Sequence, residues 1–398
     1  MSAEKTLHSS TMRTKVLVLL SAGHLVTDLA AGALPVLLPV IQAALNLSYG
    51  AAGAVSLIFN VSSSVLQPLL GHWSDKVKSR WLLPTGCILS MTGLALAGIV
   101  SSYWFILAVV FMSGLGSAAY HPEASKVSRL ASGRRRTTGM SIFIVGGALG
   151  AALGSMGMAQ LLLKFDRFAS IYFLVPGLIM AVLFFIFNRR LPDEPRAAVR
   201  NNAEAAVKVP QRVLIPLTVL IAVIIMRSWV QAGLTYFMPL YWVNYLGKSP
   251  DYVSFLVVSF MLAGAVGTVI GGPLADRFGR KSTLVASTAL LVPLLLLLKF
   301  SSGIWSMIIL FITGMVIVST MPITVVMGQE LLPHRIGVAS GLMTGFAIGM
   351  GGIGVTLLGT IADHFGAPSA LWVMTLLPIA AFLLSLFLPQ DNPVKNPW

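Results

Sequence analysis

The stretch Gly271–Lys281, GGPLADRFGRK, is a short basic turn between two long apolar runs. It contains one carboxylate, that of Asp276, and the basic residues that follow are Arg277, Arg280 and Lys281. About two hundred residues earlier, Gly71–Arg80 reads GHWSDKVKSR and places Asp75 where the later copy has Asp276. A lone basic turn is common on any surface, but two copies in register inside an apolar chain indicate two repeated halves.

The composition is that of a membrane protein. Of the 398 residues, 56% are apolar and 10% are charged, and the mean hydropathy is +0.87. Apolar runs of about 18 or more residues, the length that crosses a bilayer as a helix, recur along nearly the whole chain. We therefore expect an all-α integral membrane protein.

Twelve apolar segments, six on each side of a polar linker, are the expected membrane spans. They cover residues 15–41, 50–73, 81–101, 103–130, 138–163, 168–188, 213–242, 252–275, 282–299, 303–331, 337–362 and 369–388. We accordingly expect an N-terminal six-helix half (1–188), a cytoplasmic linker (189–212) and a C-terminal six-helix half (213–398). The linker contains RRLPDEPRAAVRNN, in which proline, charge and asparagine favour a flexible connection.

The lysines and arginines concentrate in alternate connections. With both termini inside, 22 of the 27 fall on the cytoplasmic side, 4 fall outside, and Arg227 lies within a span. This bias orients helical membrane proteins, so we expect a multi-pass protein of the cytoplasmic (inner) membrane with both termini in the cytoplasm. The net charge of +14 then reflects orientation in the membrane, and the sequence offers no aromatic and basic platform for nucleic acid.

Span 1 carries a titratable pair, His24 and Asp28, four residues apart on one helical face. A charge near the bilayer centre costs about 2.5–3.5 kcal/mol, so such residues usually line a polar interior. We expect the pair to bind and release a proton as water access changes. The alternative is a buried structural hydrogen bond between helices.

Span 4 contains a second charged group around Pro122, in the stretch AYHPEASKVSR. Glu123 and Lys126, three residues apart, are placed to pair and so to lower the cost of burying both. We expect Glu123 and His121 to act with span 1 in proton coupling. Structural pairing is the alternative.

Span 7 places Arg227 near mid-depth of the membrane, with Gln231 four residues further on. An arginine stays protonated, so it cannot be the coupling proton site, but its planar fork suits a carboxylate, phosphate or phosphonate. We expect substrate contacts from Arg227, Gln231, Lys126 and Tyr236. A permanent salt bridge from Arg227 to a buried acid, Asp28 or Glu123, remains equally open.

The two repeated turns are the expected gate. Asp75 and Asp276 are predicted to accept hydrogen bonds from a helix N-terminus in the other half, where carboxylates are favoured. The basic residues expected to pair around them are Arg129, Arg277, Arg280 and Lys281. Simple orientation by positive charge would explain the basic residues but not the aspartates. Glu330 is expected at the interface, paired with Arg335 or Arg277.

The turn within Gly271–Lys281, Gly-x-x-x-Asp-Arg-x-Gly-Arg-Lys, resembles the loop signature of the major facilitator superfamily. Prolines and glycines recur at the same offset in both halves, in the pairs Pro39 and Pro239, Pro122 and Pro322, and Gly139 and Gly341. The resemblance implies twelve helices in two six-helix halves, with a substrate site between the halves at mid-depth. In the first copy Lys78 replaces the glycine at 279, so we expect that turn to differ in geometry.

Three stretches resemble a narrower group, the fosmidomycin-resistance branch of drug/proton antiporters. They are GHLVTDLAAGALPVLLP (Gly23–Pro39), LQPLLGHWSDK (Leu66–Lys76) and AYHPEASKVSRLASG (Ala119–Gly133). The resemblance assigns proton-site roles to His24 and Asp28, and to His121 and Glu123. It implies export of a small, phosphonate-like or drug-like compound in exchange for protons, by alternating access.

The glycines of span 5 leave export and uptake both open. Span 5 has a glycine stripe but lacks the Gly-Pro pair of many drug exporters, and close helix packing explains the stripe without any transport direction. A proton-coupled uptake symporter or facilitator of an organic anion is therefore the alternative.

An enzyme is disfavoured. Cys87 is the only cysteine, and neither a nucleophile with its base nor a His-Glu-x-x-His spacing is present in a suitable context. We expect no metal and no cofactor. The expected partners are a small-molecule substrate, protons and the lipid bilayer, with the protein a monomer.

Overall fold

The computed structural model describes residues 11–77, 79–192 and 211–390, and every regular element in these ranges is helical. Ten helical stretches are long and apolar enough to cross a membrane, and Leu82–Ala97 is a shorter apolar helix. One of the ten, Arg136–Arg190, contains two predicted spans that meet at Asp166, whose φ is 50°. All twelve predicted spans are therefore present. The termini, Lys78 and most of the predicted linker lie outside the described residues.

The packing divides the chain into two compact units, which we describe separately. Unit 1 comprises Met1–Lys208 together with Leu332–Phe346, and unit 2 comprises Val209–Leu331 together with Ala347–Trp398. The predicted halves were divided within 189–212 alone. The segment 332–346 belongs by sequence to the second half but packs with the helices of the first.

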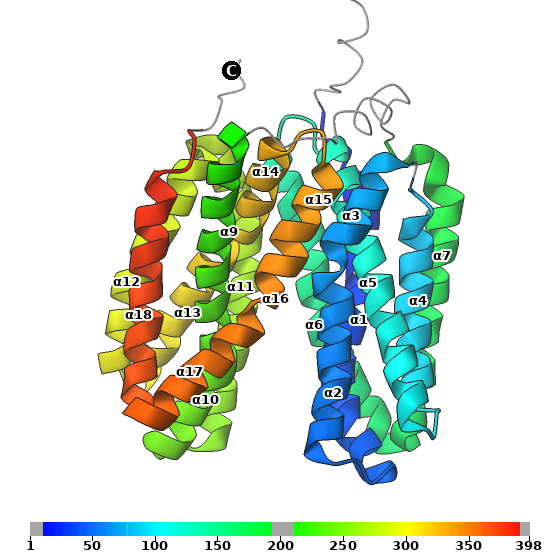
Figure 1. Ribbon diagram of the computed structural model, residues 1–398, viewed down its shortest axis with the longest axis horizontal. Coiled ribbons are helices and arrows are strands. Elements are labelled where there is room, and N and C mark those ends of the chain that lie inside the picture. The colour runs from blue at the N-terminus through cyan, green and yellow to red at the C-terminus, as the bar shows by residue number, and fades with distance from the viewer. Residues whose placement is uncertain (1–10, 78, 193–210, 391–398) are drawn as a thin grey trace, which may run out of the picture. The chain divides into compact units, whose positions relative to one another are not determined.

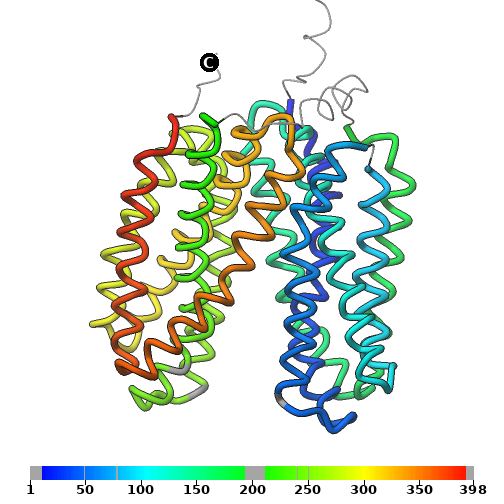
Figure 2. The backbone as a smooth tube through the Cα atoms, in the orientation of Figure 1, coloured from blue at the N-terminus to red at the C-terminus, as the bar shows by residue number. Residues whose placement is uncertain are grey.

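Unit 1 is a bundle of long helices (Figures 1 and 2). Its elements are α1 (Thr14–Ala44), α2 (Tyr49–Asn60), η1 (Val61–Val65), α3 (Gln67–Lys76), α4 (Leu82–Ala97), α5 (Tyr103–Ala131), α6 (Arg136–Phe165), η2 (Asp166–Phe173), α7 (Leu174–Phe187), η3 (Asn188–Arg190), α15 (Ile336–Ser340) and η6 (Gly341–Phe346). In Figure 1 the orange α15 runs beside the blue α3, which places 332–346 along span 2.

The glycine stripe of span 5 brings α6 close to α1. Gly146, Gly150 and Gly154 recur every fourth residue, and a Cβ at any of them would collide with a backbone carbonyl of α1. The carbonyls concerned are those of Ser21, Leu25 and Leu29. Small residues let membrane helices approach in this way, because van der Waals packing rather than water exclusion drives their association. The packing interpretation of the stripe is confirmed for these three glycines, whereas the other two of the stripe, Gly139 and Gly147, lie against Ser132 and against the side chains of His24 and Asp28.

Unit 2 is built from the remaining spans. Its elements are α9 (Gln211–Ala232), η4 (Gly233–Phe237), α10 (Met238–Leu240), η5 (Tyr241–Tyr245), α11 (Pro250–Phe278), α12 (Arg280–Phe300), α13 (Ile304–Ser319), α14 (Met321–Leu331), α16 (Ala347–Gly349), α17 (Gly351–Phe365) and α18 (Ala367–Leu386). Gly271, the first residue of the repeated turn, packs against the carbonyl of Ser319. Gly279 ends α11 with φ at 94°, a conformation that only glycine adopts without strain.

The repeated prolines do not have repeated effects. Pro122 lies inside α5, which continues without interruption from Tyr103 to Ala131. Its counterpart Pro322 follows a break at Thr320 that divides span 10 into α13 and α14. A proline removes one helical hydrogen bond, and the surrounding packing decides whether the helix continues or ends there.

Spans 2, 7 and 11 contain wide, π-helical turns that the sequence did not predict. The turns are η1, η4, η5 and η6. Such turns are rare and occur frequently at functional sites. Within unit 1, η6 packs close to span 2, because Gly341 and Gly345 leave room for the side chain and backbone of Gln67. Thr344 of η6 donates a hydrogen bond to the Gln67 amide oxygen at 2.9 Å.

Candidate functional site

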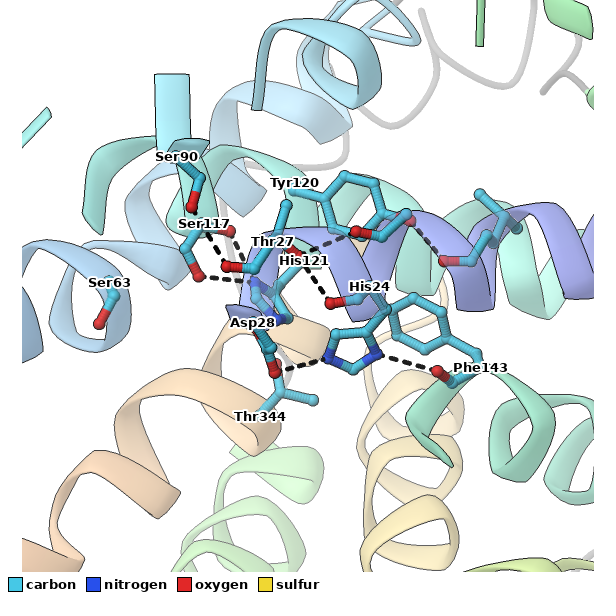
Figure 3. A network of polar contacts seen from close by, with 12 residues as sticks. His24, Thr27, Asp28, Ser63, Ser90, Ser117, Tyr120, His121, Phe143 and Thr344 are labelled. Carbon is cyan, nitrogen blue, oxygen red and sulfur yellow. Dashed lines mark hydrogen bonds and ion pairs between the residues drawn. The ribbon is translucent and has the colours of Figure 1, made fainter. Parts of the chain in front are cut away.

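A carboxylate and two imidazoles meet inside unit 1 (Figure 3). Helix α1 contributes His24 and Asp28, and α5 contributes His121. Asp28 Oδ2 lies 3.3 Å from His24 Nε2, and Asp28 Oδ1 lies 3.1 Å from His121 Nε2. The imidazole side chains are 6% and 9% exposed and the Asp28 side chain 21% exposed. We call these three residues the Asp28 trio.

Backbone carbonyls determine the tautomer of each imidazole in the trio. His24 Nδ1 lies 2.9 Å from the carbonyl oxygen of Phe143, and His121 Nδ1 lies 2.6 Å from that of Ser117. A carbonyl oxygen only accepts hydrogen bonds, so each Nδ1 must carry the hydrogen and donate it. A neutral imidazole in this tautomer has a bare lone pair on Nε2.

The trio therefore needs protons to hold together. Two Nε2 lone pairs facing an ionised carboxylate would repel it, whereas a proton in each contact makes a charge-assisted hydrogen bond. Asp28 with His24 and His121 thus forms a site for up to two exchangeable protons. The predicted pairing of His24 with Asp28 is present, and His121 joins the same acid.

Helix α6 supplies the wall of this site. The ring of His24 stacks on Phe143 with centroids 4.4 Å apart, and it meets His121 edge to face at 4.7 Å. A Cβ at Gly147 would lie 2.7 Å from Asp28 Oδ2, so only glycine at this position leaves room for the carboxylate. Neither Phe143 nor Gly147 was predicted as a site residue. One feature of the sequence could have indicated Gly147. It directly follows Gly146, so it lies outside the four-residue spacing of Gly146, Gly150 and Gly154 that packs against α1.

The same three residues have the spacing of a metal site. One ligand atom from each lies within 4.8 Å of the others. Imidazole nitrogens and a carboxylate are ligands that first-row metals accept. The sequence predicted no metal, but this spacing would also suit one. A test of proton binding therefore needs a chelator as a control.

Glu123 does not join the trio, although it follows His121 by two residues. Its Oε2 accepts from the hydroxyls of Ser74 and Ser79, each at 2.5 Å, and lies 3.1 Å from Lys126 Nζ. Lys126 also donates to the carbonyl of Ser74 at 2.7 Å. The predicted Glu123 and Lys126 pair is present. Glu123 is 2% exposed and Lys126 5% exposed, and both are bound to the end of α3.

Asp75 at the end of α3 makes the predicted contacts with a helix start. Its two carboxylate oxygens accept from the backbone N–H of Gly337, at 2.7 Å, and of Val338, at 3.0 Å. Close approach is possible because Gly71 and Gly337 face each other without side chains. Asp75 thus holds the segment 332–346 against span 2, next to the serine that binds Glu123.

The other predicted gate residues lie at helix ends. In unit 2, Arg280 Nη2 pairs with Glu330 Oε2 at 2.7 Å, a partner not foreseen for that acid, and Lys281 Nζ donates to the carbonyl of Leu386 at 2.7 Å. Arg277 lies over the ring of Phe278, while Asp276 is half-buried. In unit 1, Arg129 is half-buried in the last turn of α5.

The predicted substrate residues differ in accessibility. Arg227 on α9 is 3% exposed and donates to the carbonyl of Ile317 at 3.1 Å and to Gln231 Oε1 at 3.4 Å. Tyr236 in η4 is 65% exposed. Lys126 has its ammonium engaged by Glu123 and Ser74, as described above.

Comparison with known proteins agrees with this architecture. The model of the Major Facilitator Superfamily matches residues 20–249 and 220–397. The fosmidomycin resistance protein of Escherichia coli (strain K12) is 32% identical over 384 residues, which are 96% of this chain and 94% of that protein. The uncharacterized MFS-type transporter YfnC of Bacillus subtilis (strain 168) is 32% identical over 387 residues, 96% of this chain and 94% of YfnC.

Solved structures share the fold at low sequence identity. The fucose:proton symporter FucP of E. coli superposes with a TM-score of 0.76 at 17% identity, covering 96% of this chain and 100% of FucP. The proton:xylose symporter XylE gives 0.75 at 15% identity, covering 96% and 97%. Fold and relatives indicate a multi-pass membrane transporter rather than an enzyme, with twelve helices as predicted. The chain belongs to the major facilitator superfamily.

Proposed function

We propose that the protein is a proton-coupled secondary transporter of the bacterial inner membrane that exports a small drug-like compound. The observation that carries this proposal is the Asp28 trio, whose two imidazole contacts with one carboxylate favour bound protons. The fosmidomycin resistance protein among its relatives supports export of such a compound.

Proton binding at the trio supplies the coupling. When the carrier is open to the acidic side, the two Nε2 atoms take up protons and donate them to the Asp28 carboxylate in charge-assisted hydrogen bonds. When water from the other side reaches Asp28, the protons leave and the bare lone pairs repel the carboxylate. A substrate that enters as the protons leave completes an exchange by alternating access.

Uptake by symport is the second candidate. FucP and XylE are named as proton symporters, and they share the fold with this chain. The trio itself is compatible with either direction, because it specifies what is coupled and not which way the substrate moves. Export is preferred over uptake only because the fosmidomycin resistance protein is among the relatives of this chain.

Gating and substrate binding are assigned as follows. Asp75 holds 332–346 when the cytoplasmic side of the carrier is closed. The Glu123 and Lys126 pair stabilises the same end of α3. The repeated turn in unit 2 has the same gating role, through Asp276, Arg277, Arg280 and Lys281. In unit 1, Arg129 also contributes to gating. Gln231 and Tyr236 contact the substrate. The protein works as a monomer.

The test uses purified protein in liposomes that contain a pH-sensitive dye. An outward substrate gradient should drive proton influx for an antiporter and proton efflux for a symporter. Asp28→Asn should abolish this coupled flux while the protein remains folded, because an amide cannot hold the protons. Asp363→Asn, which changes an exposed acid of α17, is the matched control and should transport normally.

Two results would overturn the proposal. The first is coupled flux in Asp28→Asn equal to that in the unaltered protein. The second is loss of flux on adding a chelator such as EDTA. That result would mean that the trio binds a metal ion and not protons.

A further inference from the structure

Arg227 is a buried cation near the middle of span 7. The helical stretch that contains it runs from α9 to η5, residues 211–245. Its side chain contacts the backbone carbonyl of Ile317 on α13 and the amide oxygen of Gln231, both through Nη1. Both acceptors are uncharged, so neither neutralises the guanidinium.

The contacts of Arg227 leave one edge of the guanidinium unused. Nε is enclosed without a hydrogen-bond partner in the described part of the chain, and Nη2 donates to none of its residues. The N–H bonds of Nε and Nη2 point in parallel and form the side-on fork that matches two oxygens of a carboxylate or phosphate. The protein thus orients the group through Nη1 and leaves the enclosed Nε and Nη2 edge without a protein acceptor among the described residues.

No carboxylate of unit 2 compensates the charge. The acids that the structure describes there all lie near helix ends, and they are Asp251, Asp276, Glu330 and Asp363. Arg227 contacts none of them. In unit 1, Asp28 is held by two imidazoles and Glu123 by Lys126. A cation buried without a counter-charge costs several kcal/mol, which an anion arriving from solution would offset.

We propose that Arg227 is the residue that binds the anionic group of the transported compound, through Nε and Nη2. The ligand class is an organic carboxylate, phosphate monoester or phosphonate. The inference rests on the proposed transport function for the identity of the ligand, but it makes a separate claim about binding. Free inorganic phosphate offers the same oxygens, so the experiment must tell the two sources apart.

The experiment measures binding to the purified full-length protein in detergent, by calorimetry and by the ligand-induced shift in melting temperature. The probes are phenylphosphonate, its neutral diethyl ester, the phosphonate fosmidomycin and inorganic phosphate. The variants are Arg227→Lys, which keeps the charge but loses the fork, and Arg227→Gln, which loses both. Arg212→Gln is the matched control, because Arg212 is an exposed arginine on the same helix.

We expect at least one of the two phosphonates to bind the unaltered protein and Arg212→Gln with equal affinity. Arg227→Lys and Arg227→Gln should weaken that binding about tenfold or more, since both lose the two-point charge-assisted contact. The neutral ester should respond to neither change. Without ligand, Arg227→Gln should melt no lower than Arg227→Lys, because no ion pair is lost.

Equal weakening of the ester and the phosphonate would overturn the inference, as would phosphonate binding that does not depend on Arg227. Equal affinity for inorganic phosphate and for the organic phosphonates would assign the fork to a free inorganic anion and would also overturn it. Failure of the proposed function is recognised separately. Proton-coupled flux would then be missing in liposomes, while binding that depends on Arg227 could persist.

Discussion

The buried charges of the two units are arranged in opposite ways. Among the residues that the structure describes, unit 1 encloses three acids. Asp28 and Glu123 have cationic or proton-bearing partners from its own helices, and Asp75 binds two backbone N–H groups. Unit 2 encloses a cation, Arg227, and supplies it with a carbonyl and an amide only. Both arrangements are costly in an apolar surrounding, so each needs a reason.

The difference separates two kinds of functional charge. In unit 1, Lys126 balances Glu123 and one proton on an imidazole balances Asp28, so a change in proton occupancy changes the energy of the Asp28 trio. In unit 2 the guanidinium of Arg227 stays protonated at ordinary pH, and none of the described acids of that unit pairs with it. The comparison predicts that breaking a partner within unit 1 destabilises the protein more than removing the cation of unit 2.

The largest effect is expected from Lys126→Met. The change leaves the buried carboxylate of Glu123 without its cation, which costs about 3–5 kcal/mol of unfolding free energy. Thermal and denaturant unfolding of the purified protein measure it. Arg227→Met removes a charge that has no ion pair in unit 2, so its loss should be clearly smaller. Equal losses in the two variants would contradict the comparison.

A double variant tests whether the pair in unit 1 is the cause. Lys126→Met combined with Glu123→Gln removes both charges, and it should recover most of the stability lost in Lys126→Met alone. Strictly additive losses would mean that Lys126 stabilises the end of α3 through Ser74 and not through Glu123.

The next effect is expected from Gly147→Ala, which alters the Asp28 trio without removing a titratable group. The added methyl would collide with the carboxylate and with His24, at a cost of about 1–3 kcal/mol. Coupled transport should fall about ten- to hundredfold, because the two Nε2 contacts cannot both form. Gly157→Ala on the same helix is the control, since the nearest atom to its Cβ would be 3.8 Å away.

One outcome of the Gly147→Ala measurement would contradict this prediction. If Gly147→Ala transports like Gly157→Ala, the trio tolerates displacement, and its geometry is not what couples protons to the substrate.

The smallest effect is expected from Asp75→Asn. The amide keeps one acceptor for Gly337 but turns an N–H group toward the N–H of Val338, which costs about 1 kcal/mol. Transport should slow a few-fold while substrate affinity stays unchanged. Initial rates and calorimetric binding separate the two. Ser48→Ala, which removes an exposed cap of α2, should leave the rate unaffected, and loss of affinity in Asp75→Asn would contradict a gating role.

Much of the architecture followed from local signals. The length and apolarity of the runs predicted the twelve spans, since a helix that crosses a bilayer needs about 20 apolar residues wherever it lies in the chain. The four-residue spacing predicted the contact of His24 with Asp28, and the three-residue spacing that of Glu123 with Lys126, because these neighbours share a helical face. The glycine stripe predicted close packing. The contact of Asp75 with a helix start came from the repeated turn.

Other features depended on contacts between segments far apart in the chain. His121 meets Asp28 while Glu123, two residues later, turns toward Ser74 and Ser79, because residues two apart on a helix face different neighbours. The sequence grouped His121 and Glu123 as one proton site. Only the packing of α5 against α1 on one side and α3 on the other divided them.

The sequence by itself determined the membrane class, the two-fold repeat and the identity of the rare charged residues, since apolarity, spacing and the cost of burying charge are local properties. Tertiary structure alone decided which partner each described charge has, which imidazole nitrogen faces Asp28, and that Nε of Arg227 is buried without a hydrogen-bond partner in the described part of the chain. It also placed 332–346 with unit 1. These outcomes depend on which helix faces meet, and a face is chosen by backbone approach at glycines such as Gly71 and Gly337 that no periodicity reveals.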